Sequence, residues 1–542
     1  MPQNYDYDII QIGYGPVSKV AALLFARQGW KVGIFERHHE VYPLPRAVCI
    51  DHEVYRMLAA IGLEDLTRKV TEPSPIYRWF NAEWKELLAI DWTGASVSGT
   101  EGVKFVHQPS FERALCVAVK QTPNIDLHLR SEAIGLEQDD DGVTVAIRDS
   151  GTGETKRYRS RYLLGIDGAN SFVRESLGIT RTDKGFEADW LVVDFALNDG
   201  LTARDLGLVE CGQYCNPKRP TTIVPGGHDD EGRVCRRWEF MRLPHETREE
   251  MNDRAKVEEL LGDWIKPEQG ELVRHAVYTF RSLVADEWRR GRVLLAGDAA
   301  HLMPPFMGQG MCAGMRDIWN LAWKLDPVLR GTADDTILDT YQLERRPHVS
   351  DVIDASIFLG SIICIPDEAA AAQRDEMFLS GNAPPPADFP SLVGGMLDKA
   401  ADGSLKAPAG ELAPHGVVRH RGRTGRLDAL VPDGFMLVID DTIDPKTFSA
   451  ATWDVLGALG VNVVNVAAKT AASDEHYADV QGQLLPWMRA RNVAAMLVRP
   501  DFYVFGGAGD KSRLEEVVAE LGRQARELGL LREGAPKKAA AQ

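Results

Sequence analysis

The sequence predicts an α/β protein in which a parallel-sheet domain is interrupted by a β-rich insertion and followed by a smaller α/β domain. Three observations lead to this prediction. A short apolar strand at Tyr7–Ile12 runs directly into a glycine-rich turn and a helix, the order that opens a βαβ unit. From about Thr180 to Asp286 the apolar residues recur with period two, as in strands. The strand–turn–helix pattern then resumes at Gly291, so the first domain is discontinuous.

Composition limits the class of protein. The chain has 542 residues, 44% of them apolar, enough for two or three domains with large cores. A formal net charge of −17 argues against nucleic acid or an anionic membrane as a partner. The seven cysteines form no CxxC pair and predict free thiols in a reducing cytoplasm, with no metal site. No signal peptide is indicated, and the longest apolar segment is too short to span a bilayer.

The first turn carries a dinucleotide fingerprint. Gly13-Tyr14-Gly15-Pro16-Val17-Ser18 is GxGxxG with serine in the third place, where a small residue still allows the helix to pack closely on the strand. The second strand ends at Glu36, followed by Arg37. A carboxylate about twenty residues after the turn can accept hydrogen bonds from an adenosine ribose. Strand, turn, helix, strand and terminal acid predict a Rossmann-like domain that binds the ADP half of a dinucleotide.

A second motif follows near residue 300. The strand Val293–Ala296 ends in Gly297-Asp298, and Gly308-Gln309-Gly310-Met311 opens the next helix after a proline-rich turn. The strand end places Asp298 at the carboxyl edge of the sheet, where open α/β sheets bind ligands. A helix N-terminus with little side-chain bulk suits an anionic or electron-rich partner. Two further candidates are Arg46, suited to contact a phosphate or carboxylate, and Asp167, which also caps a helix after a strand.

We place the domain boundaries from these patterns. Residues 1–75, 106–180 and 287–365 form the nucleotide domain, 76–105 and 181–286 the β-rich lobe, 366–412 a linker, 413–533 the last domain and 534–542 a disordered tail.

Together the motifs resemble the FAD-dependent aromatic hydroxylases (group A flavin monooxygenases), in particular the 3-(3-hydroxyphenyl)propionate hydroxylase branch of the phenol-hydroxylase-like set. The strings PRAVCID and GQGMCAGMRDIWNLAWKL are the most specific signals, and residues 5–365 carry the resemblance. Ser18 and the bulky Trp319 depart from the family pattern. The last domain resembles the thioredoxin-like C-terminal domain of that set without its redox cysteines, which implies a packing or dimer role.

The resemblance implies where FAD would bind. Gly13, Gly15 and the following helix would hold the pyrophosphate, Glu36 the ribose and Asp298 the ribityl chain. Asp167 matches a motif associated with FAD and NAD(P)H. The remaining predicted contacts to the cofactor are Pro16, Arg37, Arg46, Gln108, Pro305, Gly308, Gln309, Gly310 and Met311.

The resemblance also implies a reaction. NAD(P)H reduces the flavin, O2 forms a flavin hydroperoxide, and an oxygen atom passes to a phenolic ring, such as that of 3-(3-hydroxyphenyl)propionate or a related hydroxylated aromatic acid. A phenol reacts faster as phenolate, so a base is expected. The candidates for this catalytic role are His52, Tyr214, His228, Tyr278 and His301. Candidates to pair with a substrate carboxylate are Arg219, Arg236, Arg237 and Arg281.

Two other functions fit the same motifs. One is a tailoring oxygenase that acts on a polycyclic or polyketide aromatic. The other is a flavin-binding protein without turnover, acting as a sensor or scaffold. Substrate-stimulated NAD(P)H oxidation separates the enzyme from the scaffold, and a substrate screen separates the two enzymes.

Overall fold

The computed structural model describes residues 5–40, 47–385, 388–470 and 473–531. The chain divides into two compact units. The first contains Met1–Gly94, Glu101–Arg316 and Ser350–Phe389, and the second contains Ala95–Thr100, Asp317–Val349 and Pro390–Gln542. The disordered tail predicted at 534–542 and the Arg46 loop lie outside the described residues.

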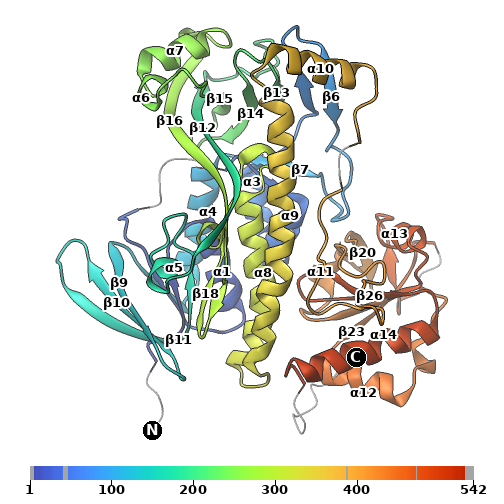
Figure 1. Cartoon of the computed structure of the whole chain (residues 1–542). Helices are drawn as coiled ribbons and strands as arrows, with labels where there is room; N and C mark the ends of the chain where they lie inside the picture. Colours follow the sequence, from blue (N-terminus) through green and yellow to red (C-terminus); the bar gives the residue numbers. More distant parts are fainter. Residues whose placement is uncertain (1–4, 41–46, 386–387, 471–472, 532–542) are drawn as a thin grey trace. The chain divides into compact units, whose positions relative to one another are not determined.

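A parallel sheet forms the nucleotide domain of the first unit, as predicted. Its five parallel strands lie in the order β8 (Ile125–His128), β2 (Val32–Phe35), β1 (Tyr7–Ile12), β11 (Thr155–Gly165) and β18 (Val293–Leu295). Antiparallel strands β9 (Ser131–Gln138), β10 (Val143–Asp149) and β17 (Arg289–Arg290) extend it, and β9 and β10 project as a hairpin in Figure 1. Helices α1 (Pro16–Arg27), α4 (Gln108–Gln121) and α5 (Phe172–Ser176) complete the domain. Strands separated by more than 250 residues therefore share one sheet.

The predicted β-rich insertion is an eight-stranded sheet. In order, its strands are β19 (His301–Leu302), β16 (Gly270–Ala285), β12 (Arg181–Leu197), β15 (Val234–Met241), β14 (Thr221–His228), β13 (Gly212–Tyr214), β5 (Tyr77–Phe80) and β6 (Glu86–Ile90). Figure 1 shows β12 and β16 as a long curved pair. On one face, which we call the outer face, Trp238 and Phe240 pack with α6 (Arg248–Met251) and α7 (Arg254–Gly262). The opposite, inner face carries Trp190, Val224 and Met241.

Shorter elements complete the first unit. They are α2 (His52–Ala60), α3 (Glu64–Lys69), α10 (Glu368–Leu379) and a small sheet of β3 (Cys49–Asp51), β7 (Val103–Val106) and β4 (Thr71–Pro73). Helices α8 (Gly310–Leu329) and α9 (Asp339–Ile363) each have residues in both units. The prediction of two separate helices at 337–344 and 349–363 is wrong, because the single helix α9 continues through Pro347. Proline removes a single N–H, and a long helix with other contacts tolerates that loss.

The last domain, in the second unit, has the predicted thioredoxin-like arrangement. Its core elements follow in the order β22 (Met436–Ile439), α12 (Ala450–Leu459), β23 (Asn462–Ala468), α13 (Leu484–Ala490), β25 (Ala495–Val498), β26 (Val504–Ala508) and α14 (Lys511–Glu527). The strand order is β23-β22-β25-β26, with β22 parallel to β23 and antiparallel to β25. Strands β24 (Tyr477–Asp479), β20 (Val417–His420) and β21 (Arg423–Arg426) extend the sheet. No cysteine follows Cys364 in the sequence, so this domain has no dithiol.

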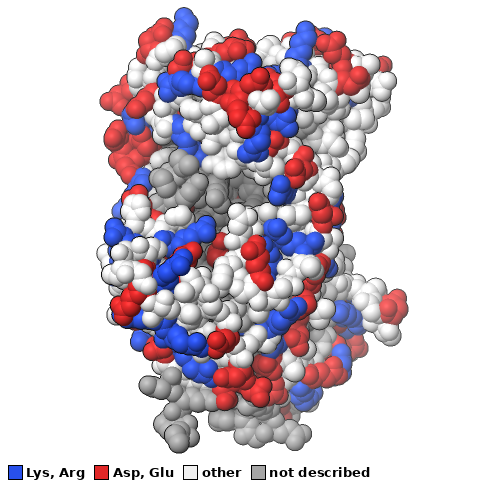
Figure 2. Space-filling model, turned by 60° about the vertical axis from the view of Figure 1, so that its left-hand side comes forward, with Lys and Arg blue, Asp and Glu red and all other residues white. Residues whose placement is uncertain are grey.

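The surface carries both signs of charge. Figure 2 shows Lys and Arg interspersed with Asp and Glu over much of the viewed face, so the acidic excess is not gathered into one field there. Among the described helices, none is by itself long and apolar enough to cross a bilayer, although one sharply bent pair, Asp335–Ile363 with Glu368–Leu379, passes on length and composition.

Candidate active site

The ends of four parallel strands bring the predicted nucleotide motifs together. Because β2, β1, β11 and β18 are parallel neighbours, the turns that follow them lie at one edge of the sheet. Three backbone hydrogen bonds connect these turns: Gly13 N to Phe35 O (2.9 Å), Ile166 N to Ile12 O (3.0 Å) and Ala296 N to Gly165 O (3.1 Å). The fingerprint near residue 13 and the motif near residue 298 therefore belong to one site.

Glycine is required at the first turn. Gly13 has φ +100°, and a Cβ there would lie 2.3 Å from Ile166 O, so no larger residue fits. Gly15 is the N-cap of α1. Among the described residues, no side chain caps that helix and no atom lies within 4 Å of the position of the missing Cβ. The N-terminus of α1 therefore has N–H donors and open space, as a pyrophosphate site requires.

Ser18 takes the place of the third glycine through hydrogen bonds. Its hydroxyl donates to Gly13 O at 2.7 Å and lies 2.7 Å from the amide of Gln11, whose nitrogen faces it when the amide is turned. Both residues are fully buried. Ser18 was expected only to be small enough for close packing, but its hydrogen bonds also stabilise the turn.

Two carboxylates border this turn. Glu36 accepts hydrogen bonds from Tyr14 N (2.9 Å) and His38 N (2.8 Å), while Arg37 is exposed beside it. Asp167 Oδ2 accepts from Val173 N at 3.0 Å, whereas its Oδ1 is buried with no hydrogen-bond partner among the described residues. Burial raises the pKa of Asp167. A buried carboxylate oxygen without a partner fits a site that a cofactor completes.

The start of α8 forms the other end of the site. Gly308 adopts φ +64°, and Gly310 begins the helix after the turn Pro305–Met307. Gln309 is buried and accepts a 2.9 Å hydrogen bond from Arg316. Arg316 in turn contacts the carboxylates of Asp51 and Glu53. These buried charges fix the position of the helix N-terminus, next to the partly exposed residues Asp298, Pro305 and Met311.

Gln108 connects the loop after Arg46 to α4. Its Oε1 accepts a 2.6 Å hydrogen bond from Ala47 N, and its Nε2 donates to Glu112 at 2.8 Å. Arg46 itself lies outside the described residues.

These features fit FAD. An uncapped helix N-terminus with room for a pyrophosphate, a partnerless buried carboxylate oxygen and a second glycine-rich helix start lie along one sheet edge. The site residues predicted near 13, 36, 167 and 298 are brought together in this way, and their contacts with FAD remain predictions.

The inner face of the β-rich lobe lies beside this site. Phe306, in the turn before Gly308, packs edge-on against Trp190 with ring centroids 5.7 Å apart. Farther along the same face, Asp194 accepts hydrogen bonds from Arg237 (2.7 and 3.1 Å) and from Arg274 (2.9 and 2.8 Å). All three charged residues are at most 7% exposed. The inner face thus offers apolar rings near the turn and buried cations beyond them.

The predicted bases occupy different places. Tyr278 is on the inner face and accepts a hydrogen bond from Arg274. Tyr214 packs with the outer-face cluster and donates to Ala82 O at 3.1 Å. His228 is half-exposed and lies 3.6 Å from Glu72. His301 packs against Trp288, and His52 begins α2, where burial lowers its pKa. Of the five, Tyr278 shares the inner face with Trp190 and Arg274.

The arginines predicted to bind a substrate carboxylate also lie in different places. Arg219 pairs with Glu246, Arg236 donates to the carbonyls of Val209 and Glu210, and Arg281 pairs with exposed Glu187. Only Arg237 is on the inner face. The sequence analysis missed its neighbours Asp194, Glu239 and Arg274. The signal in the sequence was charged residues alternating with Trp238 and Phe240, a pattern that normally indicates one exposed face, whereas the structure buries both faces of this strand.

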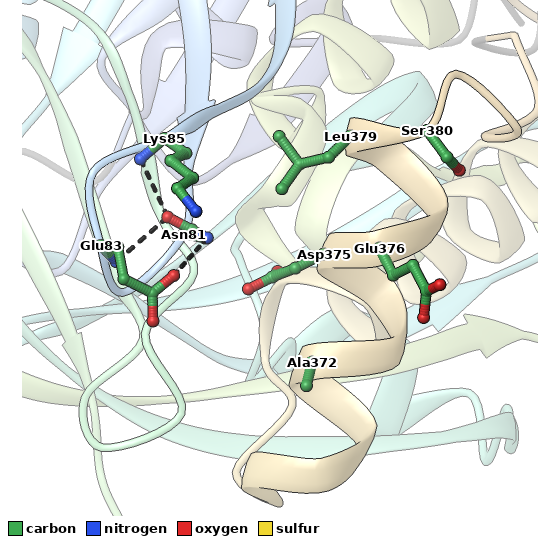
Figure 3. Close-up of a pocket in the computed structure, with 8 residues that line it drawn as sticks. All are labelled: Asn81, Glu83, Lys85, Ala372, Asp375, Glu376, Leu379 and Ser380. Carbon is green, nitrogen blue, oxygen red and sulfur yellow. Dashed lines mark hydrogen bonds between the residues drawn. The ribbon is translucent and has the colours of Figure 1, made fainter.

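A separate surface pocket lies on the far edge of the lobe. It has a volume of about 520 Å³ and is lined by the turn at Asn81–Lys85 and by α10 (Figure 3). None of its lining residues belongs to the nucleotide motifs or to the inner face, so we do not identify it as the active site.

Comparisons with known proteins agree with this geometry. Residues 6–356 match the family model described as an FAD binding domain, and 410–524 match the HcaD C-terminal domain. The chain is 34% identical to the probable NADH-specific resorcinol 4-hydroxylase of Rhodococcus jostii, over 95% of this chain and 94% of that protein. It is 30% identical to the 3-(3-hydroxy-phenyl)propionate/3-hydroxycinnamic acid hydroxylase of Escherichia coli K12, over 92% of both chains.

Solved structures show the same fold. The flavin-dependent monooxygenase PieE in complex with FAD and substrate aligns over 97% of this chain and 100% of its own, with a TM-score of 0.78 at 22% identity. Aklavinone-11 hydroxylase with FAD and aklavinone aligns over 96% and 100%, with a TM-score of 0.76 at 24% identity.

The nucleotide edge is typical of a flavoprotein, and the inner face beside it carries aromatic rings and buried charges. The chain belongs to the FAD-dependent aromatic hydroxylases, the group A flavin monooxygenases. It is an FAD-dependent enzyme.

Proposed function

We propose that this enzyme hydroxylates a single phenolic ring, such as that of resorcinol or a hydroxyphenylpropionate, with NAD(P)H as reductant and O2 as oxygen source. The observation that carries this proposal is the inner face, where Trp190 and Phe306 stand beside the glycine-rich turn and buried arginines follow. The names of the two relatives, both hydroxylases of phenols, support it. We place the enzyme in the cytoplasm, because its seven cysteines are free thiols.

Bound FAD would supply the redox chemistry, taking hydride from the coenzyme and activating oxygen. The chain's own residues provide the setting. The N–H groups at the start of α8 stabilise negative charge that develops nearby, since the helix dipole is positive there. Phe306, packed against the fully buried Trp190, provides apolar surface beside the turn and excludes water. Arg237 and Arg274 favour an anionic group on the substrate, either a phenolate or a carboxylate.

The test is a substrate panel with the purified holoenzyme. Resorcinol, 3-(3-hydroxyphenyl)propionate and 3-hydroxycinnamate are each compared with the matching compound that lacks the ring hydroxyl, and with a hydroxylated anthraquinone. NADH and NADPH oxidation, oxygen uptake and product mass are measured. We expect at least one single-ring phenol to stimulate coenzyme oxidation and gain 16 Da.

Two results would contradict the proposal. Coupled hydroxylation of the anthraquinone alone would indicate a polycyclic substrate. Flavin that is never reduced, with any coenzyme or substrate, would indicate a flavin-binding protein without turnover.

A further inference from the structure

Glu239 differs from the other charged residues of the inner face. It is 7% exposed, and no hydrogen bond to its carboxylate is recorded among the described residues. Its ionic contact is with Arg237 Nη1 at 3.8 Å, beyond hydrogen-bond distance. Asp194, two strand positions away, is fully engaged by Arg237 and Arg274. A buried carboxylate with no hydrogen bond and only one long ionic contact in the described part of the chain calls for an explanation.

Glu239 lies on the inner face, close in register to Trp190. It pairs across the sheet with Val192 on β12 and Thr222 on β14, and Val192 is two residues from Trp190. The charges of Glu239 and Arg237 both act on the thiol of Cys49. The Sγ of Cys49 lies 3.8 Å from Gly308 O, in the turn that precedes α8. Glu239 and Arg237 therefore both lie within electrostatic reach of Cys49, which contacts the turn before α8.

We infer that Glu239 is the base that takes the proton of the substrate's ring hydroxyl, while Arg237 beside it holds the oxygen anion that forms. This inference rests on the proposed function. The phenolic O–H bond breaks, an O–H bond forms on Glu239, and the electron pair stays on the ring oxygen. From there it raises the electron density of the ortho and para carbons. The proton returns to the product oxygen before release.

Charge balance favours this assignment. Arg237 and Arg274 carry two positive charges against the negative charges of Asp194 and Glu239. Transfer of a proton from a neutral phenol to Glu239 exchanges one anion for another and leaves the net charge of the buried site unchanged. Loss of the proton to solvent would instead add an uncompensated charge, which is costly in a buried site.

The proton affinities support the same step. A glutamate carboxyl and a phenol ordinarily differ by about six pKa units. Burial raises the pKa of Glu239, against the opposing effect of Arg237, and a guanidinium next to the ring oxygen lowers the pKa of the phenol. Asp194 on β12, Arg237 on β15 and Arg274 on β16 act electrostatically on Glu239. Glu239 also acts on Cys49 of β3, whose pKa burial raises to about 12.

The first experiment needs no variant. A substrate phenol is added to the holoenzyme at pH 7.5, and its ultraviolet difference spectrum reports whether the bound ring is phenol or phenolate. We expect phenolate, although the free compound is neutral at this pH. A bound phenol that stays neutral in the wild type would overturn the inference.

The second experiment compares E239Q with E187Q, which removes an exposed carboxylate from a neighbouring strand. We expect E239Q to retain FAD absorbance, to bind the phenol in its neutral form, and to lose about 10²–10⁴-fold in kcat/KM. Fluorinated phenols, which ionise without help, should recover most of that loss. E187Q should match the wild type.

An equal loss for acidic and ordinary phenols, or phenolate still bound to E239Q, would show that Glu239 has only a structural role. Wild-type enzyme that hydroxylates no phenol at all would instead contradict the proposed function, so the two failures are distinguishable.

Discussion

Arg316 forms buried ion pairs that we expect to matter most for the stability of the structure near the start of α8. Its guanidinium contacts Asp51 and Glu53, and the three side chains are at most 9% exposed. Burial alone would raise the pKa of Asp51, but Arg316 and His52 hold it below its usual value. Arg316→Met would leave two buried carboxylates without their cation. We expect a loss of about 3–5 kcal/mol in the free energy of unfolding, measured by urea denaturation, together with lower FAD content.

The control for this prediction lies on the same helix. Arg330 pairs with Asp326 at 2.8 Å, but the arginine side chain is 43% exposed. Arg330→Met should cost less than about 1 kcal/mol. Similar losses in the two variants would show that burial of the Arg316 cluster contributes little.

At the scale of single residues, the sequence predicted which residues occupy the nucleotide motifs, but not which charged side chains are buried together. Gly13 and Asp167 could be predicted because their spacing is constrained by the strand–turn–helix unit that they serve. Glu239 could not, since an acidic residue in a period-two strand is normally on the exposed face. Only the structure shows that both faces of β15 are covered.

Gly314 lies where α8 packs against α1 at the active site, so a substitution there tests how close that packing must be. A Cβ at this position of α8 would lie 2.8 Å from Val17 Cγ2 in α1 and 3.0 Å from Gly297 Cα. Alanine normally stabilises a helix interior by about 1 kcal/mol relative to glycine. Here the overpacking cost of about 1–3 kcal/mol should be larger. Gly314→Ala should therefore lower the melting temperature and weaken FAD binding, measured by flavin fluorescence.

Gly457→Ala is the matched control in another helix. In the part of the chain that the structure describes, no atom lies within 4 Å of its missing Cβ in α12, so helix propensity alone should raise stability. If both glycine variants were stabilised, close packing of α1 on α8 would not limit the site.

Among the elements, those with a clear period were predicted well. The strand predicted at Tyr7–Ile12 has the bounds of β1. By contrast, β12 extends over Arg181–Leu197, but only its apolar part, residues 190–195, could be recognised. The first half of β12 is polar because β15 pairs only with residues 190–196, which leaves that edge of the first half unpaired among the described strands. This half is a strand because it pairs with β16, not because of its composition.

In the second unit, charges on α8 and α9 are buried with the last domain. Glu344 accepts hydrogen bonds from Lys324 (2.6 Å), Asn320 (2.7 Å) and Arg499 (2.6 Å), and the three charged side chains are fully buried. Burial would raise the pKa of Glu344, but Arg499 and Lys324 lower it to about 2. Glu344→Gln should destabilise the protein by about 3–5 kcal/mol at pH 7.

The pH dependence of that loss has a definite sign. Because the pKa of Glu344 is lower in the folded state, its stabilising effect is present above the unfolded value near 4.5 and is lost as the pH falls towards 2. The difference between wild type and Glu344→Gln in thermal unfolding should therefore shrink in acid. The control Glu411→Gln removes a partly exposed pair with Arg491. It should have little effect at any pH.

For the whole molecule, the interruption of the nucleotide domain was predicted from strong local patterns, whereas the thioredoxin-like character of the last domain was predicted from its resemblance to a known family. The assignment of Asp317–Val349 to the unit that holds the last domain did not. It depends on buried contacts such as that between Glu344 and Arg499, 155 positions apart. A single sequence does not show which distant residues meet.

One short segment has a consequence for how the polypeptide is made. Residues Ala95–Thr100 belong to the second unit although the chain on both sides belongs to the first. Gly99 accepts a hydrogen bond from Gln481, 382 positions later. On the ribosome this hexapeptide emerges long before its partners, so the second unit can close around it only after Gln481 has been synthesised.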